Sequence, residues 1–184
     1  MSDEFLGERR RVLEDSFFAQ RDRELMKELK KQVNAEALSD ACGIKNQAVL
    51  EGLVNANISP ETITALTLVP LIAVAWADGK IAPEERAAIF AATESVGIEA
   101  DSVCRQLIEA WLAEAPGPEL VEAWKGYIRA LAASASAAAV ETLRGDVLDH
   151  ARGIATAAGG ILGVGSISKS EKAVIDDLAS VFSS

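Results

Sequence analysis

Apolar residues recur at helical spacing along most of this 184-residue chain, and no segment sustains the alternation that a strand requires. In the first segment, about residues 3–33, one narrow helical stripe carries four apolar residues at spacings of seven, four and four: Phe18, Leu25, Leu29 and Val33. Charged residues cover its other faces. We expect this arm to dock on the body of the same chain, which we favour, or on a partner.

The remaining pattern predicts further helices, and two prolines mark special positions in them. Ser59-Pro60 has the sequence of a helix start, and Pro70 is expected to kink the helix that follows. The apolar run Leu68 to Ala77 indicates a buried central helix. The helices are expected over residues 35–42, 46–55, 60–77, 83–96, 102–115, 119–133, 138–158 and 170–182. The chain is therefore predicted to be all-α, a single-domain bundle (residues 34–184) with an N-terminal helical arm (residues 1–33).

Composition supports the all-α fold class and limits the classes of molecule that are expected as partners. Hydrophobic residues make up 49% of the chain but aromatic residues only 5%, a balance that favours helix over strand. The net charge is −10, and residues 1–32 hold eight basic and eight acidic residues, so the body carries the whole excess. An acidic body repels phosphate backbones, which argues against nucleic acid and favours cations or basic partners.

The cysteines and the apolar segments indicate the cellular compartment in which the chain is expected. Cys42 and Cys104 form no CxxC pair, and they are expected to be buried free thiols in a reducing compartment. The N-terminus lacks the apolar core of a signal peptide. The longest apolar run has ten residues, whereas a membrane span needs about 20. We expect a cytoplasmic protein without a transmembrane segment, and peripheral membrane association stays open.

One short unit recurs in the sequence. GKIAPEERAAI, which begins at Gly79, and GSISKSEKAVI, which begins at Gly165, are similar at six of eleven positions and lie 86 residues apart. Each has the outline of a turn that enters a helix. The recurrence indicates either an internal duplication of a helix–loop–helix unit or capping chemistry that both helix starts share.

The first copy resembles half of a calcium-binding loop. If Gly79 is loop position 6, then Asp78 is position 5 and Glu85 is position 12, as an EF-hand requires. Positions 1 and 3 would then be Val74 and Trp76, which have no oxygen ligand for a hard cation. A conventional EF-hand is excluded, and a partial cation site remains.

Helix capping explains the same residues without a metal. Ser168 to Glu171 reads S-x-x-E, the pattern of a reciprocal capping box. In the first copy Pro83 suits the first helical position and Glu85 the third, although Ala82 offers no side-chain acceptor. Asp78 has no evident capping role. Capping alone and metal ligation are therefore both open.

The stretch LVPLIAVAWADGKIAPEERAAI resembles the signature of the TerB-like (tellurite resistance) family, and the arm and the tail look like those of a bacterial subgroup. The resemblance implies an all-α fold, a link to stress and tellurite responses, and divalent-cation binding by acidic residues. By position, Asp78 and Glu85 match the first acidic unit of the family and Glu171 matches the second. Val164 departs from the pattern, because an acidic residue is expected there.

The remaining chemistry is sparse. His150 is the single histidine, so no trio of nucleophile, base and orienting residue can be assembled. We expect a non-catalytic binding or sensing module of a stress response that holds a divalent cation (Ca, Mg, Mn or Zn) at Asp78, Glu85 and Glu171. The alternative is a structural adaptor whose arm recruits a protein partner or a second copy. A metal-dependent enzyme is a third hypothesis.

Overall fold

The computed structural model describes the backbone of residues 2–159 and 167–183, with side chains at residues 20, 21, 23–157 and 167–183. Within those residues every regular element is helical, which confirms the predicted fold class. Two elements are 3₁₀-helices, η1 (Ile63–Leu68) and η3 (Val181–Ser183). The α-helices are α1 (Ser2–Cys42), α2 (Gln47–Asn55), α3 (Val69–Ala75), α4 (Pro83–Ser95), α5 (Val103–Ala113), α6 (Pro118–Ser134), α7 (Ala137–Gly159) and α8 (Lys169–Ser180).

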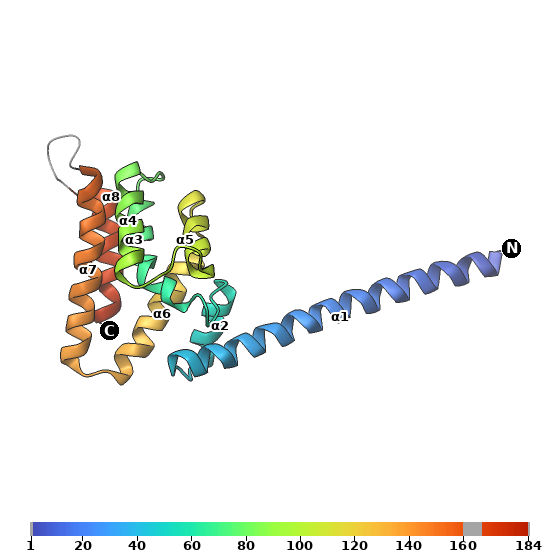
Figure 1. Ribbon diagram of the computed structural model, residues 1–184. Helices are drawn as coiled ribbons and strands as arrows, with labels where there is room; N and C mark the ends of the chain where they lie inside the picture. The colour runs from blue at the N-terminus through green and yellow to red at the C-terminus, as the bar shows by residue number, and fades with distance from the viewer. Residues whose placement is uncertain (1, 160–166, 184) are drawn as a thin grey trace.

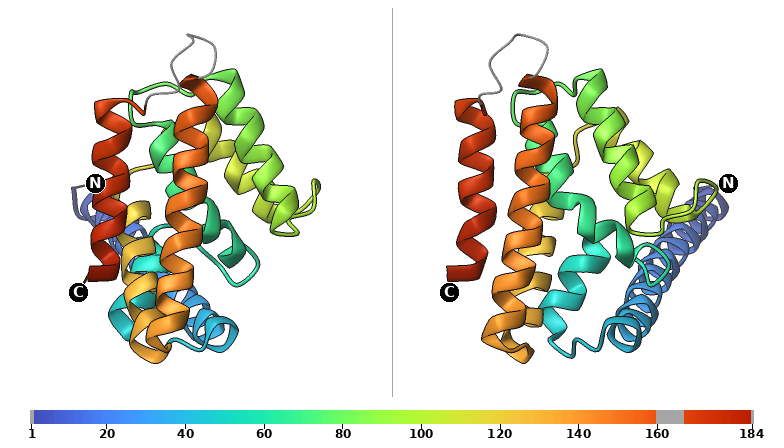
Figure 2. Two further views of the ribbon diagram at one scale, coloured as in Figure 1. Left: turned by 90° about the vertical axis from the view of Figure 1, so that its left-hand side faces the viewer. Right: turned by 60° about the vertical axis from the view of Figure 1, so that its left-hand side comes forward.

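The molecule consists of a helical body and one long helix that leaves it. Figure 1 shows α1 extending away from the body, with the N-terminus at its far end. In Figure 2, α7 and α8 run side by side on one flank, while α3 lies inside the body. Helix α3 packs against α4, α6, α7 and α8, and α2 lies between α1 and α6.

Helix α3 forms the centre of the core. Six of its seven residues are buried, as expected for a helix that is apolar on every face. The sequence places all three tryptophans among apolar neighbours, in the core or an interface. Trp111 and Trp124 are buried, whereas Trp76 is only half-buried and its indole Nε1 donates to the carbonyl oxygen of Trp111 at 2.8 Å. The predicted central helix is confirmed.

The segment before α3 differs from the prediction of one kinked helix over residues 60–77. Ser59 and Thr62 close a turn, in which the Thr62 amide donates to the Ser59 carbonyl at 3.0 Å. The 3₁₀-helix η1 follows, and the α-helix begins only at Val69. Pro70 therefore lies in the first turn of α3, where its missing amide leaves no helical hydrogen bond unmade and no kink results.

The other helix boundaries follow local chemistry. Ser102 caps α5 by accepting from the Arg105 amide at 3.1 Å. Gly97 follows α4 with a φ of +74°, a conformation that favours glycine. The sequence also predicts a glycine-rich loop over residues 159–168, and most of that loop, residues 160–166, lies outside the described residues.

Helix α1 is longer than predicted, because the separate helix expected over residues 35–42 is its C-terminal end. Gly43, with a φ of +72°, follows it. Ala35 and Leu38 are buried in the core cluster, and α1 packs on α2. Two turns at its C-terminal end thus anchor α1 to the body.

Candidate functional site

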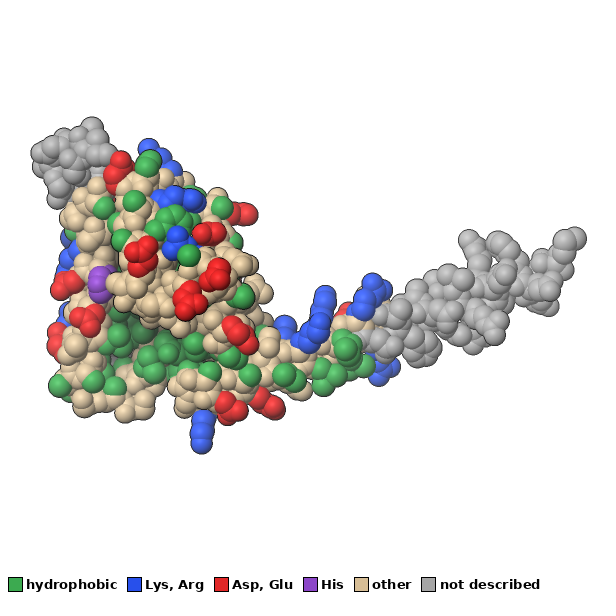
Figure 3. Space-filling model, in the orientation of Figure 1, with side chains coloured by type: hydrophobic (Ala, Val, Ile, Leu, Met, Phe, Trp, Pro, Cys, Tyr) green, Lys and Arg blue, Asp and Glu red, His purple; other side chains and the backbone are tan. Residues whose placement is uncertain are grey.

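The described side chains of α1 that precede the anchor are uncovered. Every described side chain from residue 20 to residue 34 is exposed. Among them are four large apolar side chains, here called the arm face, that are 54–62% exposed: Leu25, Met26, Leu29 and Val33. Figure 3 shows hydrophobic side chains along the arm. The expected docking of this stripe on the body of the same chain is therefore wrong for residues 25, 29 and 33, while the side chain of Phe18 lies outside the described residues.

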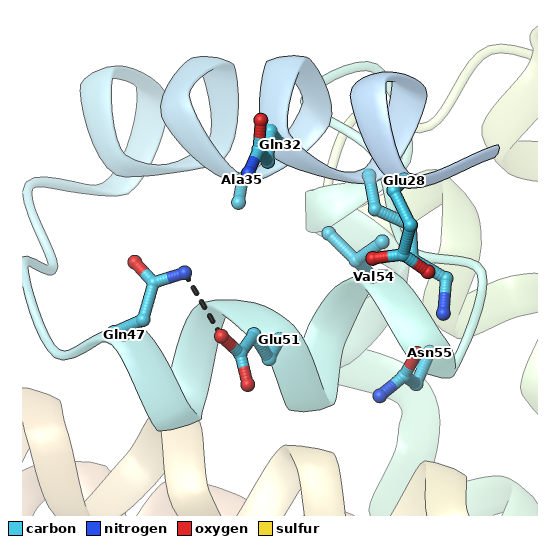
Figure 4. Close-up of a pocket in the computed structure, with 8 residues that line it drawn as sticks. Glu28, Gln32, Ala35, Gln47, Glu51, Val54 and Asn55 are labelled. Atoms are coloured by element: carbon cyan, nitrogen blue, oxygen red, sulfur yellow. Dashed lines mark hydrogen bonds between the residues drawn. The ribbon is translucent and has the colours of Figure 1, made fainter. Parts of the chain in front are cut away.

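A polar cleft of about 260 Å³ lies where the arm leaves the body. Figure 4 shows its walls, formed by Glu28, Gln32 and Ala35 of α1 facing residues of α2. On the α2 side, Gln47 Nε2 donates to Glu51 Oε1 at 3.0 Å. No residue of the arm face lines this cleft. Helix α2 therefore does not cover the arm face, although it lies beside the same helix.

A second groove, of about 640 Å³, lies between α2 and α6 on the other side of α2. We call it the α2/α6 groove. Its lining is dominated by small side chains, and Figure 3 shows a hollow lined by hydrophobic side chains near the base of the arm. Two acidic residues and one arginine also line it, Glu119, Glu122 and Arg129. The small residues of the lining are Ala48, Gly52, Ala123, Gly126, Ala130 and Ala133.

The two recurring helix starts lie at the same end of the body, at the N-termini of α4 and α8 (Figure 2). At α8 both halves of the predicted capping box form: the Ser168 amide donates to Glu171 Oε2 at 2.6 Å, and the Glu171 amide donates to Ser168 Oγ at 3.2 Å. At α4 the Ala82 amide donates to Glu85 Oε2 at 2.7 Å. Both glutamates are buried. The capping interpretation is therefore confirmed at both sites.

The fold also brings the predicted acidic residues within electrostatic reach of one another. Burial raises the pKa of Glu85, and the negative charges of Glu171, Asp78 and Glu84 raise it further. The hydrogen bond from the Ala82 amide acts in the opposite direction. Two helix starts that are 86 residues apart in sequence thus share one acidic environment.

Asp78 has a local structural role that the sequence did not reveal. Its Oδ1 accepts from the Lys80 amide at 3.1 Å, across the turn in which Gly79 has a φ of +86°. Its side chain is exposed, unlike those of Glu85 and Glu171. Among the described residues, no three Asp, Glu, His or Cys side chains form a group that could hold a metal ion. Asp78, Glu85 and Glu171 therefore do not form a three-ligand group in the described part of the chain, and the metal assignment stays a prediction.

The other candidate residues contribute no further cluster. His150 and Asp146 are both exposed on α7. The two cysteines are free: Cys104 is buried, which raises the pKa of its thiol, and Cys42 is half-buried. Sequence analysis missed the α2/α6 groove. The signal available was the spacing of small residues at three or four positions, as in Ala48 and Gly52 or in Gly126 and Ala130.

No helix in the described part of the chain is long and apolar enough to cross a membrane. Comparisons with models of protein families, with curated proteins and with solved structures find no match to this chain.

Proposed function

We propose that this chain is a non-catalytic helical adaptor, in which the body is a platform and the arm face is the docking surface for a protein partner. One observation carries the proposal: four large apolar side chains stand exposed in a row on a helix that leaves the body. Single exposed apolar residues are ordinary, whereas a contiguous row of them marks an interaction surface.

Physical chemistry supports a partner for this face. Full burial of one Leu, Met or Val side chain stabilises a complex by about 1.5–3 kcal/mol before the costs of association. A helix without tertiary packing is only marginally stable in water, so a partner that covers the arm face would also stabilise the helix itself. An amphipathic helix that lays its apolar side into a groove is a common mode of recognition.

A photo-cross-linking amino acid at position 29 tests the proposal in the full chain. Position 103 is the matched control, because Val103 is 59% exposed but lies on α5 of the body. We expect a discrete protein adduct from position 29 that is absent from position 103 and is lost when Leu25→Glu is added. The absence of an adduct at position 29 would contradict the adaptor proposal.

A second candidate function is cation sensing at the paired helix starts, as the TerB resemblance implies for a stress response. The observation that favours it is the shared negative environment of Glu85, Glu171 and Asp78. A divalent cation would relieve that repulsion, but it would compete with the backbone amides for the carboxylate oxygens. We therefore expect weak binding.

Calorimetric titration with Ca²⁺, Mg²⁺, Mn²⁺ and Zn²⁺ tests cation sensing. The variant to compare is Asp78→Ala/Glu85→Gln, because glutamine at the third helical position keeps an acceptor for the Ala82 amide. Heat of binding in the wild type that disappears in this variant would support the site. Equal heats of binding in the wild type and the variant would rule out a cation site at Asp78 and Glu85.

A further inference from the structure

The arm face and the α2/α6 groove together indicate which kind of partner the arm binds. This inference rests on the proposed adaptor function. We propose that the arm face of one copy occupies the α2/α6 groove of a second copy, and that the exchange is reciprocal. Both surfaces belong to the same chain, and both are uncovered in it.

The two surfaces are complementary in shape. The arm face presents long side chains, while six of the twelve residues that line the groove are alanine or glycine. Small residues on the receiving helices let the backbone of an incoming helix approach closely, so that long side chains of that helix fill the space between them. Gly52 on α2 leaves open space, because a Cβ added there would meet nothing within 4 Å.

The two surfaces are also complementary in charge. Residues 20–34 hold five basic and three acidic residues, a net charge of +2, whereas the chain as a whole carries −10. Lys30 lies next to Leu29 and Met26 around the helix. Glu119, Glu122 and Arg129 line the groove, which gives its lining a net charge of −1, and Glu122 is already paired with Lys125 at 2.9 Å. Opposite charges at the margin of an apolar contact steer association and fix its register. The segment that carries the arm face is therefore net basic, although residues 1–32 as a whole are neutral, and it suits an acidic body.

The arm cannot fill the groove of its own chain. Helix α1 is continuous from Ser2 to Cys42, and the stretch that carries the arm face borders α2 only through the polar cleft, on another side of the helix. Residues 25–33 could turn back only if the helix broke, at the loss of its hydrogen bonds. A second copy needs no such break, and a reciprocal exchange closes a two-fold dimer in which neither apolar surface remains uncovered.

Sedimentation velocity on the full chain over a range of concentrations tests the proposal. The arm variant is Leu25→Glu/Leu29→Glu, with Val103→Glu as its control on an exposed site of the body. The groove variant is Gly52→Trp, with Gly153→Trp as its control, since a Cβ at either glycine meets nothing within 4 Å and helix propensity improves.

We expect a wild-type dimer, and dimer dissociation constants raised roughly 100-fold by either variant and unchanged by either control. A mixture of the two variants is the sharper test. It joins an intact arm face to an intact groove, so it should form a mixed dimer that is tighter than either variant alone.

Each contrary result has a distinct meaning. A monomeric wild type would overturn the second copy as partner, and the cross-linking experiment at position 29 would then decide the adaptor proposal separately. A dimer that is lost in the arm variant but unchanged by Gly52→Trp would overturn the groove, because the arms would then pair with each other. A dimer unaffected by the arm variant would overturn the inference entirely.

Discussion

Two helices of this molecule place their apolar side chains in opposite surroundings. Helix α3 buries six of seven residues among four other helices, while the arm exposes all four residues of the arm face. Both segments are recognisably apolar in sequence. The difference shows that apolar residues in α3 hold the monomer together, whereas those of the arm are available for a partner.

The largest expected effect lies in the core. Ile72 is fully buried in α3, and Ile72→Ala leaves a cavity that is expected to lower the free energy of unfolding by about 2–5 kcal/mol. Urea denaturation followed by circular dichroism measures it. A loss below about 1 kcal/mol would mean that α3 is not the packed centre of the body.

A capping residue should have an intermediate effect. Glu171→Ala removes the acceptor for the Ser168 amide at the start of α8, and we expect a loss of about 1 kcal/mol. Glu171→Gln is the control, because it retains an oxygen at the same position. Equal losses in the two variants would contradict a capping role and point to the charge itself.

The pH dependence of stability tests the shared acidic environment. The pKa of Glu85 is raised above 4.5 in the folded state by burial and then by neighbouring carboxylates. The folded state therefore holds the proton more tightly, so this contribution to stability is present at low pH and is lost as the pH rises through the raised pKa.

Glu85→Gln should remove that dependence while an acceptor for the Ala82 amide remains. Relative to this variant, the wild type is expected to lose stability between pH 4.5 and neutral pH. Urea midpoints across that range measure the difference. Parallel profiles for the two proteins would show that folding does not raise the pKa of Glu85.

The smallest expected effect lies on the arm. Leu29→Ala removes a side chain that is 54% exposed, so the free energy of unfolding of the dilute protein should change by less than about 0.5 kcal/mol. The same urea experiment as for Ile72→Ala measures it, which makes the two variants a direct pair. A loss close to that of Ile72→Ala would show that the body covers the arm.

Features set by local chemistry were predictable from the sequence. The Ser168 to Glu171 capping box, the Ser102 cap and the glycine that follows α4 each depend on residues within one turn of one another. The start of α3 was not predictable in the same way. Whether a proline kinks a helix or begins one depends on the tertiary contacts that hold the preceding 3₁₀ turn.

The candidate sites show the same division between features that the local sequence predicts and features that depend on tertiary packing. The amphipathic stripe predicted that residues 25, 29 and 33 pack against another surface, but a stripe does not indicate which molecule provides that surface. The recurrence of one unit marks Glu85 and Glu171 as equivalent positions, but their proximity depends on how the two units pack. The α2/α6 groove is lined by Gly52 of α2 and Ala130 of α6, which are far apart in sequence. No local pattern indicates that these two helices pack against each other.

Hydrogen–deuterium exchange on residues 20–34 tests the central claim most directly. In dilute protein we expect these amides to exchange rapidly, while those of residues 35–42 are protected by the anchor on α2. As the protein concentration rises, residues 20–34 should gain protection together with α2 and α6. Strong protection of residues 20–34 in the dilute monomer would contradict the account, because the body would then already cover the arm face.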